Sequence, residues 1–156
     1  MSAIVTTLTP FRELHLLQEA LQSLAVACKV VQNTPLILQT DRKSYRGFQC
    51  FVFENNQFVL RSDSHDDAMI PYRQLKDKTH LPIKEFLAQV DTAYQAAYER
   101  EQEALAEAER QRKEVERIVF IEAQKTAIRE KAKALGYSVQ EKKVGTKIQL
   151  VLIRHS

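Results

Sequence analysis

The dominant pattern in the chain is a stretch of helix-forming residues over 83–135. Ala, Glu, Gln, Lys and Arg fill it, and it has no internal glycine or proline. Apolar positions are frequent in its first third, rare over 99–117 and frequent again towards its end. A heptad repeat continued from the first third places Glu101 and Gln111 at core positions, which a strong coiled coil avoids. The stretch therefore predicts either one very long helix or a helical hairpin that turns within 107–115.

A second amphipathic helix is expected near the N-terminus, over 11–25. Four leucines recur there at intervals of three and four residues, which places them on one side of a helix. Thr9 is the expected N-cap, and Pro10 suits the first helical position because its missing N–H has no helical partner there. The four leucines are Leu14, Leu17, Leu21 and Leu24.

Short runs rich in β-branched and aromatic residues predict strands before and after the long helical stretch. Residues 41–44 are expected to form a polar turn, and Asn55 with Asn56 suits a type I′ turn because asparagine tolerates positive φ. Gly136 follows the long stretch at the position where a left-handed C-cap favours glycine. The expected strands are 3–8, 26–32, 36–40, 47–53, 58–61, 137–143 and 147–154.

These elements predict an α+β fold with an antiparallel or mixed sheet of about five to six strands, one amphipathic helix and the long helix or helical hairpin. Strands and helices do not alternate regularly, as they would in a parallel doubly wound sheet. The last strand, 147–154, is apolar on both faces, which predicts an interior strand. A chain of 156 residues fits a single domain over 1–156, in which 99–117 is a charged helical projection.

Charge is distributed unevenly, although the formal net charge is only +3. Residues 1–98 carry ten basic and ten acidic side chains, 99–116 carry four and seven, and 117–156 carry nine and three. A cationic block therefore follows an acidic segment. No stretch approaches the roughly 18 consecutive apolar residues of a membrane span, and no signal peptide is visible near Met1. We therefore expect no membrane contact, and a cytoplasmic location or, for a plastid-encoded protein, the plastid stroma.

Motifs of catalysis and ligand binding are missing, and we expect a protein that is not an enzyme and holds no cofactor and no metal. The three glycines lie far apart, which excludes a loop that cradles phosphate. The run 63–67, which includes Asp63, His65, Asp66 and Asp67, and nearby His80 offer residue types that bind divalent metals, but their spacing matches no metal motif, and a solvated turn is the stronger interpretation. Both cysteines lie in apolar, strand-like stretches, where free thiols are expected.

The thin apolar coverage of the long helix predicts a contact with another protein. A helix that extends beyond the body of its domain gains little by packing on that domain, and association with a second helix covers its exposed side chains. Our first hypothesis is therefore an interaction module, an adaptor or a subunit of a larger assembly, with a protein partner or self-association through this helix. The expected contact residues are Tyr94, Tyr98, Leu105, Val115 and Ile118.

The cationic block supports an alternative, a nucleic-acid-associated protein. Clustered lysines can meet phosphates, but Tyr137 is the one aromatic residue among them, whereas readers of single strands stack bases on several aromatic rings. An ordinary solvated surface accounts for the same lysines. The residues of this alternative are Lys131, Lys133, Lys142, Lys143 and Lys147.

Two ends of the chain carry a family resemblance. The segments are MSAIVTT at 1–7 and LLQEALQSL at 16–24, then AKALGYSV at 132–139 and IQLVLIR at 148–154. Together they resemble a small family of hypothetical chloroplast reading-frame proteins, found in cyanobacteria and algal plastids and as a domain of unknown function in other bacteria. The resemblance implies an α+β domain and an accessory role beside ATPases of the AAA type, and it transfers no functional residue. This chain departs from the family in its centre, where it carries the charged helical stretch of 99–117.

Overall fold

The computed structural model describes residues 2–71 and 80–154. The chain divides into two compact units, Met1–Gln102 (unit 1) and Glu103–Ser156 (unit 2). The boundary falls within one long helix, α3 (Ile83–Ala134), so that each unit contains part of it. The sequence suggests a single domain with a projection over 99–117, and the boundary between the units lies within that segment.

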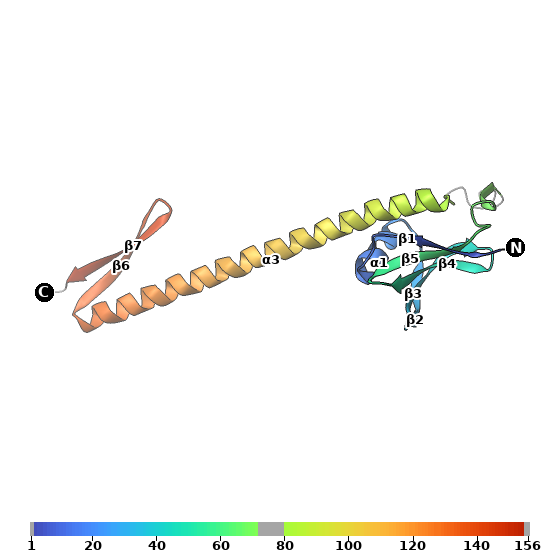
Figure 1. The fold of residues 1–156 in the computed structure, drawn as a ribbon. Helices are drawn as coiled ribbons and strands as arrows, with labels where there is room; N and C mark the ends of the chain where they lie inside the picture. The colour runs from blue at the N-terminus through green and yellow to red at the C-terminus, as the bar shows by residue number, and fades with distance from the viewer. Residues whose placement is uncertain (1, 72–79, 155–156) are drawn as a thin grey trace. The chain divides into compact units, whose positions relative to one another are not determined.

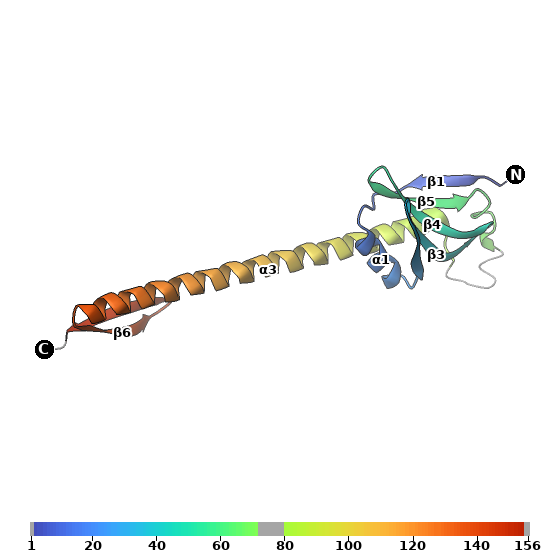
Figure 2. The same cartoon turned by 90° about the horizontal axis from the view of Figure 1, so that it is seen from below.

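Unit 1 contains a five-stranded antiparallel sheet and the helix α1 (Leu14–Ser23), as Figure 1 shows. The strands lie in the order β1-β5-β4-β3-β2, of which Figure 2 shows the first four from edge to interior. The predicted α+β class is therefore confirmed. The strand bounds are β1 (Ile4–Leu8), β2 (Cys28–Asn33), β3 (Leu36–Ser44), β4 (Gly47–Glu54) and β5 (Gln57–Asp63).

The core of unit 1 lies between the sheet and two helical segments, α1 and the first turns of α3. Leucines of α1 and apolar side chains at helical spacing on α3 meet the inward side chains of β3, β4 and β5. Side chains of about Leu or Phe size each contribute roughly 1.5–3 kcal/mol when fully buried. The core members are Phe11, Leu16, Leu17, Ala20, Leu21, Leu38, Phe51, Phe58, Leu60, Phe86, Val90, Tyr94 and Ala97.

Helix α1 begins at Leu14, later than the sequence predicts. Thr9 lies outside the helix: its hydroxyl donates to the carbonyl oxygen of Phe58 on β5 and accepts the backbone N–H of Phe11 at 3.4 Å. The backbone N–H of Phe58 in turn donates to the carbonyl oxygen of Phe11, at 2.7 Å. Residues up to Phe11 are therefore held to the sheet, and Glu13 is the N-cap residue.

Strand β3 is longer than predicted, because the expected turn at 41–44 is part of the strand. Arg42 explains the difference. Its side chain is buried, its Nε donates to Gln49 Oε1 at 2.8 Å, and its Nη2 donates to the carbonyl oxygen of Leu81 at 2.7 Å. The guanidinium also lies 4.0 Å from the ring centre of Phe86. A buried arginine with these partners fixes an extended backbone where the sequence alone predicts a polar turn.

The predicted turn at Asn55 and Asn56 and the predicted cap at Gly136 are both confirmed. Both asparagines have positive φ, between the paired residues Glu54 and Gln57 of β4 and β5. Gly136 has φ +82°, and its N–H donates to the carbonyl oxygen of Lys133 in the last turn of α3.

Helix α3 is continuous, so the helical hairpin that the sequence left open is not formed. Its sparsely apolar middle, 99–117, is exposed except at the half-buried Glu101, and it carries ion pairs at spacings of three and four residues. Such pairs stabilise a helix by about 0.2–0.5 kcal/mol each. They are Glu107–Arg110, Glu109–Lys113, Arg112–Glu116 and Glu114–Arg117.

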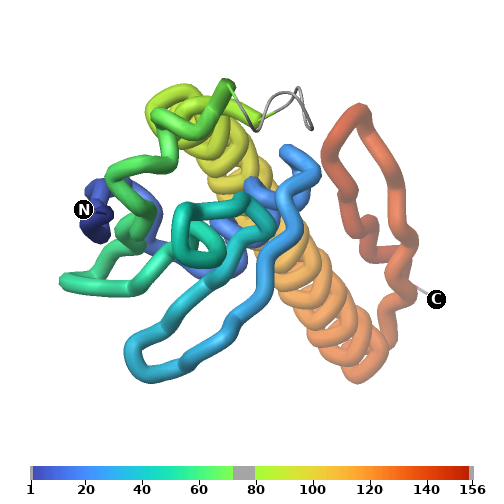
Figure 3. The backbone as a smooth tube through the Cα atoms, turned by 90° about the vertical axis from the view of Figure 1, so that its right-hand side faces the viewer, coloured from blue at the N-terminus to red at the C-terminus, as the bar shows by residue number. Residues whose placement is uncertain are grey.

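Unit 2 consists of the second part of α3 and a hairpin of two antiparallel strands, β6 (Tyr137–Val144) and β7 (Lys147–Arg154). Figure 3 shows the two strands side by side after the end of α3. The sequence predicts an interior position for β7, and this prediction is wrong: among the described strands, β7 pairs with β6 alone. Its two apolar faces therefore do not indicate neighbours on both edges.

Candidate interaction surfaces

Tyr94, one of the predicted contact residues, belongs to the core of unit 1. Its side chain is 6% exposed and its ring lies 5.0 Å from that of Phe11. Its hydroxyl oxygen accepts the backbone N–H groups of Arg12 and Glu13, at 3.2 and 3.0 Å. These N–H groups precede α1 and would otherwise lack a partner. Tyr94 thus has little surface left to offer to another protein.

The other predicted contact residues lie on exposed surface of α3. Tyr98, in unit 1, is about half exposed, as is Ile118 in unit 2. Leu105 and Val115, also in unit 2, are each 59% exposed. These four side chains are therefore available, although they do not form one continuous face, because the helix turns by about 100° per residue.

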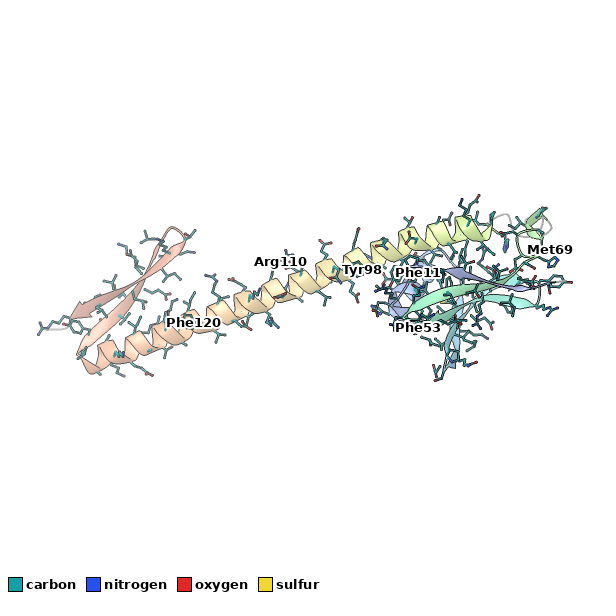
Figure 4. All side chains as sticks on the ribbon, viewed as in Figure 1. Phe11, Phe53, Met69, Tyr98, Arg110 and Phe120 are labelled. Atoms are coloured by element: carbon teal, nitrogen blue, oxygen red, sulfur yellow. The ribbon has the colours of Figure 1, made fainter. Side chains whose placement is uncertain are left out.

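Two further exposed side chains extend this surface, Val119 and Phe120, each 62% exposed. Figure 4 labels Phe120 on α3, with Phe11 and Phe53 of unit 1 for comparison. We refer to Leu105, Val115, Val119 and Phe120 as the outer stripe. The predicted contact residues do not include Phe120. A signal for it exists in the sequence, because a large aromatic residue beside isoleucines at 118 and 121 places apolar side chains on more than one side of the helix.

On another side of α3, a groove of about 590 Å³ separates the helix from the hairpin. The helix contributes Ile118, Ile121 and Ile128, and the hairpin contributes Ile148 and Leu150. All five are only partly buried. The hairpin therefore covers the helix incompletely, and α3 carries apolar side chains both towards the hairpin and on the outer stripe.

Lys125 ties the helix to the hairpin. Its ammonium group forms an ion pair with Glu141 on β6 and another, at 3.2 Å, with Glu122. Arg129 lies 3.4 Å from the second carboxylate oxygen of Glu141. The hydrogen bond with Glu141 raises the pKa of Lys125, and the same bond lowers the pKa of Glu141. Glu122 and Glu141, two of the three acidic side chains within 117–156, are thereby paired with basic side chains of the same unit.

The pairing of β6 with β7 assigns the hairpin side chains to two faces. Directly paired residues of an antiparallel ladder share a face, and neighbours along a strand alternate. Lys143 pairs with Ile148 and Glu141 with Leu150, so these four lie on the face towards α3. Lys142 lies on the opposite face, which we call the outer ribbon face. It carries Ser138, Gln140, Lys142, Val144, Lys147, Gln149, Val151 and Ile153.

The five lysines of the nucleic-acid hypothesis are therefore placed differently from one another. Lys142 and Lys147 share the outer ribbon face, whereas Lys143 lies on the face towards α3. Lys131 and Lys133 are exposed in the last turns of α3, where a positive charge interacts favourably with the helix dipole. The structure brings two of the five together on one sheet face.

The acidic loop after β5 is a structural element of unit 1. Asp66 is buried, and its carboxylate accepts hydrogen bonds from Ser44 Oγ, Gln49 Nε2 and the backbone N–H groups of Tyr45 and Asp63. Burial raises the pKa of Asp66, but these hydrogen bonds outweigh that effect and leave it below its usual range. The carboxylate thus joins β3, β4 and β5.

No group of three metal-binding side chains occurs within 2–71 and 80–154. His65 Nδ1 donates to Asp63 Oδ1 at 3.1 Å, and Asp67 Oδ1 accepts the N–H of Ile83 at the start of α3. Cys28 and Cys50 are free thiols, and burial raises the pKa of each.

In the part of the chain that the structure describes, no helix has the length and apolar character needed to cross a bilayer.

A scan against protein-family models, a search of curated proteins and a search of solved structures each returned no match. The resemblance of the two ends of the chain to the chloroplast reading-frame family stays a prediction.

Proposed function

We propose that the protein is a non-enzymatic interaction module whose contact surface is the outer stripe of α3 in unit 2. The main observation in support is that four apolar side chains of one helix are each more than half exposed: Leu105, Val115, Val119 and Phe120. An α-helix with apolar side chains on more than one side is normally buried on more than one side. A protein partner, either a second copy or another chain, would supply the missing cover.

Unit 1 supports the proposal by supplying a firm anchor. Within it, α3 is joined to α1 by the ion pair Arg100–Glu19 at 2.6 Å and by His15–Glu101 at 2.7 Å. The core residues Phe86, Val90 and Ala97 hold the same helix to the sheet. The part of α3 that carries the outer stripe thus continues from a helix that is already folded and packed.

Photo-crosslinking tests the proposal. A benzophenone amino acid replaces Val119 in the full chain, and the same residue replaces Gln111 as a control on an exposed polar position of the same helix. We expect discrete adducts from position 119, identified by mass spectrometry as a second copy or a specific protein, and none from position 111. Phe120→Glu should abolish the adducts, whereas Gln111→Glu, which adds the same charge, should keep them. Equal adduct patterns at both positions, or none at either, would contradict the proposal.

A second function, association with nucleic acid, is favoured by the charges of unit 2. Lys125 and Arg129 hold Glu141, and Lys125 also holds Glu122, so that these acidic groups do not oppose a bound phosphate. Among the described residues, Lys142 and Lys147 form no ion pair. We propose that the exposed lysines of unit 2 bind nucleic acid, largely through its phosphate groups, which makes binding strongly dependent on salt.

Retention on nucleic acid tests this second function. Wild-type protein should elute from immobilised DNA or RNA at a higher salt concentration than the variant Lys142→Glu with Lys143→Glu. Complete elution of the wild-type protein at about 50 mM salt, where phosphate contacts are strong, would exclude the function.

A further inference from the structure

The β6–β7 hairpin is a two-stranded antiparallel ribbon with one face that is open and free of acidic side chains. Three cross-strand pairs make up the part of the outer ribbon face nearest the turn: Gln140 with Val151, Lys142 with Gln149, and Val144 with Lys147. The single acidic residue of the described hairpin, Glu141, lies on the other face and is bound by Lys125. The acidic charge of the hairpin is therefore confined to the face towards α3.

The polar side chains of the outer ribbon face can all donate hydrogen bonds. Two are ammonium groups, two are glutamine amides and one is a hydroxyl. Lysine, glutamine and serine side chains are among those that contact DNA phosphates, and glutamine and lysine also bind the edges of adenine and guanine in the major groove. Residues Ser138, Gln140, Lys142, Lys147 and Gln149 make up this set.

We propose that the outer ribbon face binds duplex DNA by entering the major groove. This inference rests on the second of the two proposed functions and assigns it a surface and a partner. The major groove of B-form DNA, about 12 Å wide, admits a two-stranded β-ribbon. Lys142 and Gln149, directly paired across the two strands, face the base edges, and Lys147 at the turn meets phosphate.

The shape of the ribbon distinguishes DNA from RNA. The major groove of an A-form duplex is deep and narrow, and protein side chains do not read it. The scarcity of aromatic side chains on this face also disfavours single strands, whose bases need stacking partners. Duplex DNA is therefore the preferred ligand, ahead of duplex RNA and single-stranded DNA of the same length.

Two adjacent lysines provide a matched test. The full chain is titrated onto a fluorescein-labelled DNA duplex of about 20 base pairs at 50 mM salt, and binding is followed by fluorescence anisotropy. Lys142→Gln and Lys143→Gln remove the same charge from neighbouring residues on opposite faces of the ribbon. We expect Lys142→Gln to weaken binding about tenfold, within the range of a lost base-edge contact, and Lys143→Gln to weaken it less than twofold.

The outcomes separate the inference from the function on which it rests. Equal weakening by the two substitutions would overturn the ribbon face and leave association with nucleic acid standing. Tighter binding of duplex RNA or single-stranded DNA than of duplex DNA would overturn the major-groove geometry. No anisotropy change with any of the three nucleic acids would overturn both.

Discussion

Units 1 and 2 use apolar side chains in opposite ways. Of the seventeen buried apolar side chains among the described residues, sixteen lie in unit 1, and Ala132 is the one in unit 2. Unit 2 instead holds more than half of the large apolar side chains that are exposed, from Leu105 to Leu152. Burial of such side chains is the main source of folding free energy. Unit 1 therefore buries much of its apolar surface within itself, whereas unit 2 leaves many of its large apolar side chains exposed.

The difference also concerns polar groups. Unit 1 buries Arg42, Gln49 and Asp66 and satisfies them with one another and with the backbone. Unit 2 depends on ion pairs on or near its surface, which contribute little each. Substitutions of the same type should thus change stability more in unit 1 than in unit 2.

The largest difference in stability is expected between alanine substitutions of two phenylalanines, one in each unit. Phe51 is fully buried on β4, and Phe51→Ala should lower the free energy of unfolding of unit 1 by about 3–5 kcal/mol through lost burial and a residual cavity. Phe120→Ala in unit 2 should change stability by less than about 0.5 kcal/mol in dilute protein, because Phe120 is solvated. Hydrogen exchange with mass spectrometry under increasing urea reports each unit separately. A large loss of stability from Phe120→Ala would show that unit 2 has a core of its own.

Asp66→Asn should have the next largest effect. An amide cannot accept all the hydrogen bonds of the Asp66 carboxylate, and its own N–H group would face other donors, so a loss of about 1–3 kcal/mol from unit 1 is expected. Asp67→Asn keeps an acceptor for the N–H of Ile83 and serves as the control with a smaller effect. Urea denaturation followed by near-ultraviolet circular dichroism measures both. Equal stability of the two variants would show that the Asp66 network does not hold the strands.

The same carboxylate predicts the pH dependence of unit 1. The folded-state pKa of Asp66 is lowered, so its contribution to stability is complete above the unfolded-state pKa of about 3.9 and is lost as the pH falls from there through the folded-state pKa. The difference in the free energy of unfolding between wild type and Asp66→Asn should therefore become smaller as the pH falls below about 4. Urea midpoints measured from pH 3 to pH 7 test this. A difference that stays constant over that range would contradict the assignment.

Tyr94 and Tyr98 give a comparison along one helix. Tyr94→Phe removes the acceptor of two backbone N–H groups at the start of α1 and should lower the stability of unit 1 by about 1–2 kcal/mol. Tyr98→Phe, at a half-exposed position, should change it by less than about 0.5 kcal/mol. Thermal unfolding of the two variants distinguishes them, and a larger effect from Tyr98→Phe would reverse the assignment of core and surface.

The sequence alone predicts those features that depend on local patterns. The long helix, the turn at Asn55 and Asn56 and the cap at Gly136 follow from residue propensity and spacing. The strand over 41–44 does not, because a polar stretch becomes extended only when Arg42 finds Gln49 and Leu81, which lie elsewhere in the chain. Local pattern determines the elements, and partners distant in sequence determine their exact length.

The candidate surfaces show the same limit. Exposure of Leu105 and Val115 was predictable because few apolar residues accompany them, but the role of Tyr94 depends on backbone N–H groups just before α1, more than eighty residues away. The separation of Lys142 from Lys143 onto two faces follows from strand alternation. Alternation does not say which of the two lysines is turned towards α3. The groove and the ion pair between Glu141 and Lys125 show this.

The smallest effect is expected where the hairpin meets α3. Lys125→Met keeps the apolar stem but removes the partner of Glu141, so amides of β6 and β7 should exchange faster while those of unit 1 are unchanged. In wild-type protein the attachment should hold between about pH 4.3 and pH 10.4, because the pKa of Glu141 is lowered and that of Lys125 is raised. Lys131→Met, at an exposed lysine of the same helix, is the control. If both variants leave hairpin exchange unchanged, the apolar groove side chains hold the hairpin to α3 without the ion pair.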